Sequence, residues 1–186
     1  MLCVGQTGVG KTTELVKASQ ELRTEYVLVG PPVDRYLDLA ILGWHDVIAF
    51  SCIWAAATTG TLDDSEVLPR LIEIIGGERR VPSPSSPPVS AKALGEIISL
   101  GRIPEPSALQ RFRNEHQKIK ERIAKGPAQV ADLCRQIVAE IEKKAGRPLV
   151  VMLDGVEKVT MKVARNLFYE EARLLFELPF RSAVVA

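Results

Sequence analysis

A glycine-rich octapeptide close to the N-terminus constrains this sequence more than any other feature. Residues 5–12 read Gly-Gln-Thr-Gly-Val-Gly-Lys-Thr and fit the pattern G-x-x-x-x-G-K-[ST] in full. The apolar run Met1–Val4 precedes them, and Thr12–Arg23 follows with apolar residues at helical spacing. The pattern therefore predicts a short buried strand, a tight turn and an amphipathic helix in succession.

Each residue type in this octapeptide suits the binding of a polyphosphate. Glycines permit a tight turn that brings bare N–H groups toward anionic oxygens, and the following helix adds the positive end of its dipole. Lys11 supplies a flexible charge for the β- and γ-phosphates, and the Thr12 hydroxyl is a ligand for magnesium. We therefore expect ATP with Mg²⁺ to bind here. The expected contact residues are Gly5, Gln6, Thr7, Gly8, Val9, Gly10, Lys11, Thr12 and Thr13.

Two acids follow a second apolar run far along the chain. Leu149–Leu153 is continuously apolar, as in a strand buried on both faces, and Asp154 comes directly after it. A phosphate loop needs such an acid to hold the magnesium shell, so Asp154 is the expected second metal residue. Glu157 follows three residues later, and we expect it to polarise the water that attacks the γ-phosphate. The alternative is that Glu157 is a surface acid paired with Lys158 or Lys162.

The order of apolar runs predicts an α/β fold. Strands are expected at Met1–Val4, Tyr26–Val29, Leu149–Leu153 and Ser182–Ala186, with helical stretches at 12–23, 34–57 (Gly43 as a kink or boundary) and 160–178. Strands that alternate with helices in this way are typical of a doubly wound, mainly parallel sheet in three α/β/α layers.

Residues 60–148 look like an insertion between core strands. It starts with a short helix that ends at Gly76-Gly77, and residues 79–90 then form a Pro/Ser-rich linker. Apolar stripes and the Gly126-Pro127 break predict a helical hairpin over 107–146. Ser107 to Arg147 holds ten Lys or Arg against five acids, so contact with nucleic acid is an alternative to solvated helix faces. His116 lies in the apolar stripe, where packing is expected rather than metal binding.

Composition limits the class of protein. A chain of 186 residues is long enough for one domain with a real core, and 24 basic residues balance 23 acids. Its three cysteines are widely spaced without a CxxC pair, which favours a reducing compartment over disulfides or zinc. No signal peptide or run long enough to cross a bilayer is visible, so we expect a cytoplasmic protein. Trp44 and Trp54 are expected in the core.

The phosphate loop, the long helical insertion and the strand that ends in Leu-Asp-Gly-Val-Glu-Lys-Val resemble the AAA+-related ATPases of the STAND and KAP kind. The resemblance covers Met1 to about Val29 and Leu149 to Ala186. It implies that Asp154 is the magnesium-coordinating acid and Glu157 the first downstream acid. Lys158 departs from the pattern where a second acid is common, and Gly155 departs from members with adjacent Asp-Glu. The resemblance also implies a sensor strand, a lid and protein partners or self-association.

Other functions compete with an ATP-hydrolysing regulatory domain. The family's sheet continues where this sequence stops, so a partial domain that has lost catalysis and serves as a binding module is one alternative. A kinase with the same loop is another, although no Arg-rich lid segment is visible. A GTPase is disfavoured because neither the D-x-x-G glycine nor an N-K-x-D motif appears. Arg35 and Arg79 have no stronger claim as phosphate sensors than other arginines.

Overall fold

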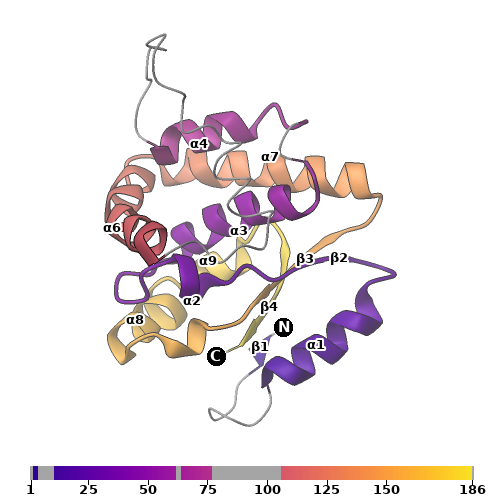
Figure 1. Ribbon diagram of the computed structural model, residues 1–186, viewed down its shortest axis with the longest axis horizontal. Coiled ribbons are helices and arrows are strands. Elements are labelled where there is room, and N and C mark those ends of the chain that lie inside the picture. The colour runs from indigo at the N-terminus through magenta and orange to yellow at the C-terminus, as the bar shows by residue number, and fades with distance from the viewer. Residues whose placement is uncertain (1, 4–10, 62–63, 77–105, 186) are drawn as a thin grey trace.

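The structure is a computed structural model that describes residues 2–3, 11–61, 64–76 and 106–185 (Figure 1). Loop residues Gly5–Gly10 and the predicted linker 79–90 lie outside these ranges. Within them, helices surround a small parallel sheet, as Figure 1 shows. The predicted α/β class is therefore confirmed.

Four short strands form one sheet in the order β1–β4–β3–β2. They are β1 Leu2–Cys3, β2 Val27–Val29, β3 Leu149–Leu153 and β4 Arg181–Val185. All three neighbouring pairs are parallel. Each strand begins and ends within one residue of its prediction over the described part of the chain. Parallel neighbours require long crossover connections, which here are helical.

Helices lie on both sides of the sheet (Figure 1). Helix α1 (Lys11–Leu22) lies on one side, whereas α3 (Trp44–Thr58) and α7 (Pro127–Ala145) lie on the other. This arrangement follows from the strand order. The chain crosses the sheet in one direction from β1 to β2 and returns from β2 to β3, and right-handed crossovers in opposite directions place their helices on opposite faces.

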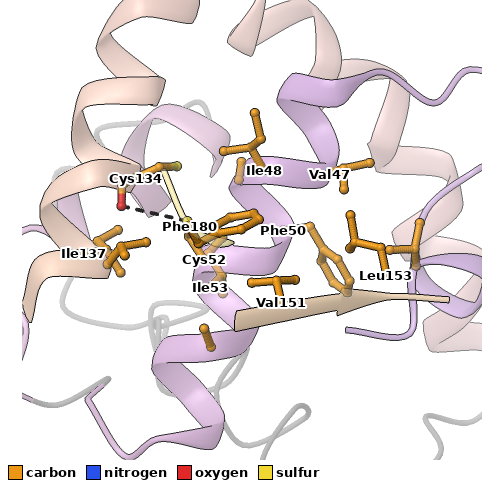
Figure 2. Packing of buried hydrophobic residues seen from close by; sticks show 14 of the residues in the cluster. Val47, Ile48, Phe50, Cys52, Ile53, Cys134, Ile137, Val151, Leu153 and Phe180 are labelled. Atoms are coloured by element: carbon orange, nitrogen blue, oxygen red, sulfur yellow. Dashed lines mark hydrogen bonds between the residues drawn. The ribbon is translucent and has the colours of Figure 1, made fainter. Parts of the chain in front are cut away.

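Helix α3 forms the centre of the core. It is apolar on every side, as expected of a helix without a solvent face, and it packs between α7 and β3 (Figure 2). The predicted helical stretch 34–57 divides at Gly43, because α2 covers only Val33–Tyr36. The Gly43 amide donates to the Asp46 carboxylate at 3.0 Å, which caps the start of α3. Trp44 is fully buried, and Trp54 packs against the core.

The predicted helical hairpin consists of α6 (Pro106–Ile123) and α7, and α4 (Leu68–Gly76) precedes it. Gly126 lies between the two helices and Pro127 is the first residue of α7, as expected. Both hairpin helices contact α3 and α4, so the hairpin shares the core that covers the sheet. The predicted apolar stripe of α7 is entirely buried: Val130, Leu133, Cys134, Ile137, Val138 and Ile141.

The prediction of a single helix over 160–178 is wrong, because the helix is interrupted. Thr160 caps a first helix, α8 (Met161–Arg165), but a π-helical turn η2 (Asn166–Glu170) then precedes α9 (Ala172–Phe176). Tertiary contacts explain the change in helix type. The Trp44 indole Nε1 donates to the Leu167 carbonyl at 2.7 Å, and the Trp44 amide donates to Glu171 at 3.1 Å. These contacts tie the π turn to the start of α3.

Candidate functional site

The carboxyl ends of all four strands meet at one edge of the sheet, because every strand pair is parallel. The register defines a row of residues along this edge. Cys3 is paired with Val185, and Pro32 forms an isolated bridge with Asp154. Leu153 pairs with Val184, so Asp154 lies at the level of Val185 and Cys3. We call this row and the residues that follow it the carboxyl edge.

The elements on either side of the predicted phosphate loop, β1 and α1, both have an end near this edge. Strand β1 ends at Cys3, and α1 begins at Lys11. Since β1 and β2 are parallel, α1 runs back along the sheet and its N-terminus lies near the carboxyl edge. Lys11, Thr12 and Thr13 form the first turn of α1, where backbone N–H groups have no partner within the helix. The strand and helix expected on either side of the loop are confirmed.

Asp154 comes directly after β3 on the same edge. Its side chain is half-buried, and the Gly155 amide donates to its Oδ1 at 3.0 Å. One strand, β4, separates β3 from β1. At a strand spacing of about 4.8 Å, Asp154 and Cys3, the last described residue before the predicted phosphate loop, are therefore about 10 Å apart. Magnesium keeps several waters and binds through one or two carboxylates plus phosphates, so an acid at this separation fits such a site.

A 3₁₀ turn, η1 (Val156–Lys158), follows Asp154 and contains Glu157. The Lys158 amide donates to the Gly155 carbonyl at 3.2 Å, which closes the turn. Thr160 then caps α8 by accepting a bond from the Val163 amide. Glu157 thus lies on the predicted loop beyond the carboxyl end of β3, and its catalytic role stays a prediction.

One ion pair at this edge was not expected from the sequence, which offered Glu157 and not Asp34 as a partner for Lys158. Asp34 lies in α2, just past the carboxyl end of β2, and the Lys158 Nζ lies 2.5 Å from its Oδ2. A signal for Asp34 did exist, because it follows the second predicted strand and parallel strands end at a common edge. No local pattern predicts its partner, since the two residues are 124 positions apart in the sequence.

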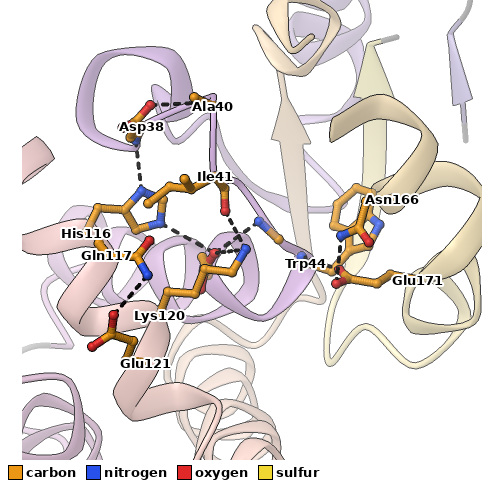
Figure 3. A network of polar contacts seen from close by, with 12 residues as sticks. Asp38, Ala40, Ile41, Trp44, His116, Gln117, Lys120, Glu121, Asn166 and Glu171 are labelled. Atoms are coloured by element: carbon orange, nitrogen blue, oxygen red, sulfur yellow. Dashed lines mark hydrogen bonds and ion pairs between the residues drawn. The ribbon is translucent and has the colours of Figure 1, made fainter. Parts of the chain in front are cut away.

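His116 belongs to a buried polar network (Figure 3). Its Nδ1 accepts a hydrogen bond from the Asp38 amide at 2.9 Å, and its Nε2 lies 3.4 Å from the Asp46 carboxylate. An Nδ1 that accepts must be unprotonated, so Nε2 carries the proton in the neutral ring and faces Asp46. Lys120 of α6 donates to the Ile41 carbonyl beside them. The network joins α6 to the start of α3, and His116 is a packed residue as expected.

Several basic side chains of the hairpin have partners within the chain. They are Lys120 and Arg122, which donate to the carbonyls of Ile41 and Ile75, Arg147, which donates to the Arg23 carbonyl, and Arg135 and Lys144, which pair with Asp132 and Asp64. These five basic side chains of the hairpin therefore form hydrogen bonds or ion pairs within the chain itself. Arg35 is exposed, and Arg79 lies outside the described residues.

Two free thiols meet where α3 contacts α7 (Figure 2). The Cys52 Sγ lies 3.9 Å from the Cys134 carbonyl oxygen, and both side chains are fully buried. Burial raises the pKa of the Cys52 thiol, and its hydrogen bond with the Cys134 side chain raises that pKa further. A thiol kept protonated in this way is a poor nucleophile.

Within the described ranges, no three or more His, Cys, Asp or Glu side chains are grouped as metal ligands. None of the helices in those ranges has the length and apolarity needed to cross a bilayer. Comparison of the chain with protein-family models, with curated proteins and with solved structures gives no match in any of the three. Arguments about function therefore depend on the residues at the carboxyl edge.

Proposed function

We propose that this chain is an ATP-binding and ATP-hydrolysing regulatory domain with the doubly wound, three-layer fold of the P-loop NTPases. One observation carries the proposal. The register sets Asp154 level with Cys3, two strands away, so the acid after β3 and the end of β1, which leads into the glycine-rich octapeptide, share the carboxyl edge. Helices on both sides of the parallel sheet are consistent with this fold. The resemblance to STAND and KAP ATPases agrees with it.

Different residues of this chain would bind the phosphates, bind magnesium and accept the proton. Backbone N–H groups of the loop and of the first turn of α1 would hold the β- and γ-phosphate oxygens, with Lys11 as the mobile charge. The Thr12 hydroxyl and Asp154 would hold magnesium, which when bound neutralises charge on the phosphates. Glu157 would accept the proton of the water that attacks the γ-phosphorus, while ADP leaves with the bridging oxygen.

Lys11→Ala tests nucleotide binding. Removing the ammonium group should abolish ATP binding detectable by calorimetry, whereas Lys17→Ala, on the exposed part of the same helix, should bind like the parent. A thermal-shift series gives a second readout, because ligand at a hundredfold excess over Kd stabilises the native state by about 2.7 kcal/mol. A parent chain that shows neither heat nor shift at millimolar Mg-ATP would contradict the proposal.

Glu157→Gln tests hydrolysis separately. The amide cannot accept the proton, so ATP binding should persist while the hydrolysis rate falls by about 10²- to 10⁴-fold. Equal rates in the variant and the parent would remove Glu157 from the mechanism. Binding without hydrolysis in the parent would instead indicate a nucleotide-binding module, and transfer of labelled phosphate to a small acceptor would indicate a kinase.

A further inference from the structure

Asp34 and Lys158 connect two segments at the carboxyl edge that are remote in the sequence. Asp34 follows β2, and Lys158 ends the turn that follows β3 and Asp154. Their charged atoms are 2.5 Å apart, the distance of a direct charge-assisted hydrogen bond. The pair therefore holds the turn after β3 against the segment after β2.

Gly155 brings the backbone of this turn onto Asp34. Its φ is +91°, a conformation that favours glycine. A Cβ added at Gly155 would lie 3.0 Å from the Asp34 Cβ and 3.1 Å from its Cγ, tighter than most Cβ contacts, so Asp34 would have to move by a few tenths of an ångström. Together with the bridge between Pro32 and Asp154, three successive contacts join the two segments.

We propose that Asp34 is a positioning residue for Asp154, and that Lys158 is its partner in this role. Asp154 is the first residue of the turn that these contacts fix, so the contacts set the direction of its carboxylate before any ligand arrives. Exposed ion pairs contribute little to stability, and Lys158 is 56% exposed. A role in orienting the acid is the use that the geometry supports. The inference rests on the proposed function, since it assigns Asp154 to magnesium.

The same contact accounts for Lys158, which stands where the resembling ATPases commonly have an acid. Asp34 supplies a negative charge from helix α2, which follows a different strand, so the carboxyl edge keeps an acid close to the turn. The pair also holds the Lys158 ammonium group on Asp34, one residue away from Glu157. Loss of Asp34 would remove this contact from the turn that carries both proposed acids.

The test measures the Mg²⁺ concentration that gives half-maximal ATP binding, with calorimetry on the full chain. Asp34→Asn and Lys158→Gln should each raise this concentration about tenfold, the size of effect seen when residues that orient a metal ligand are lost. The melting temperature should change little, because the Lys158 side of the pair is exposed to solvent. The exchange Asp34→Lys with Lys158→Asp should restore the requirement to within about twofold of the parent, since it rebuilds the pair in reverse.

Lys144→Gln is the matched control. Lys144 pairs with Asp64 at 2.6 Å and is similarly exposed, but it lies near the start of β3. Its loss should leave the magnesium requirement unchanged. Parent-like magnesium dependence in both single variants overturns this inference and leaves the proposed function intact. A parent that binds no ATP at any magnesium concentration overturns the proposed function, and this inference with it.

Discussion

Gly155 is a residue whose backbone disfavours a side chain and whose surroundings leave little room for one. Its φ of +91° strains any other residue, and a Cβ would press on Asp34 at 3.0 Å. Gly60 and Gly146 share the positive φ, at +68° and +65°, but a Cβ at either would meet nothing within 4 Å. These three glycines therefore separate the cost of backbone strain from the cost of a close contact.

We predict that Gly155→Ala destabilises the chain by about 2–3 kcal/mol, and that Gly60→Ala and Gly146→Ala cost about 1 kcal/mol each. The difference reflects the contact with Asp34, which must move for the methyl group to fit. Urea denaturation followed by circular dichroism measures all three. Equal losses would mean that Asp34 gives way without cost.

Single residues also show which features could be predicted from the sequence and which could not. Asp154 was predicted because an acid directly after a buried apolar run is a local pattern, and the structure has it at the expected edge. The pair of Asp34 and Lys158 was not predicted, because 124 positions separate the two residues and only the order of strands brings them together. His116 was predicted to pack, yet its hydrogen bond from Asp38 depends on a loop from another part of the chain.

At the scale of elements, the sequence predicted which segments are helices or strands, and where they lie, better than it predicted whether a helix is interrupted. Strands β2 and β3 are short apolar runs next to glycine, proline or charged residues, so their limits could be predicted. The interruption between α8 and α9 could not, because Asn166–Glu170 has no proline or glycine to break a helix. Its cause is Trp44, which is more than 120 positions earlier and binds the Leu167 carbonyl.

Trp44→Phe should therefore loosen the α8–α9 region more than the rest of the molecule. Phenylalanine retains most of the packing but leaves the buried Leu167 carbonyl without the indole donor, at a cost of about 1–3 kcal/mol. Amides of α8, η2 and α9 should exchange with deuterium faster, while those of α7 keep their protection. Trp54→Phe is the control, since Trp54 lies on the same helix and packs against Tyr36 and Phe50. Uniform acceleration across the chain would contradict this prediction.

At the scale of the whole molecule, the buried thiol of Cys52 makes stability depend on pH. Burial raises its pKa in the folded state, whereas in the unfolded chain the thiol titrates near its ordinary value of about 8.5. Above that pH the unfolded chain loses the proton first, so it binds fewer protons than the folded chain and unfolding becomes more favourable.

We predict that the free energy of unfolding carries no Cys52 contribution to its pH dependence below about pH 8. Above the unfolded-state pKa, this thiol should lower it by up to about 1.4 kcal/mol per pH unit. Urea titrations between pH 7 and 10 measure the slope, and Cys52→Ala should remove the part due to this thiol. An identical slope in the variant would show that other groups cause it.

The position of β4 in the sheet determines when, during translation, the sheet can form in full. Strand β1 is hydrogen-bonded to β4, so the first strand described pairs with the last strand described, which is synthesised much later. At about 5–20 residues per second, roughly 10–35 s of translation separate the two. Until then the strand that leads into the glycine-rich octapeptide lacks this neighbour. A nascent chain that has not yet reached Arg181 should therefore be unable to retain nucleotide, and contacts between such distant residues favour slow folding.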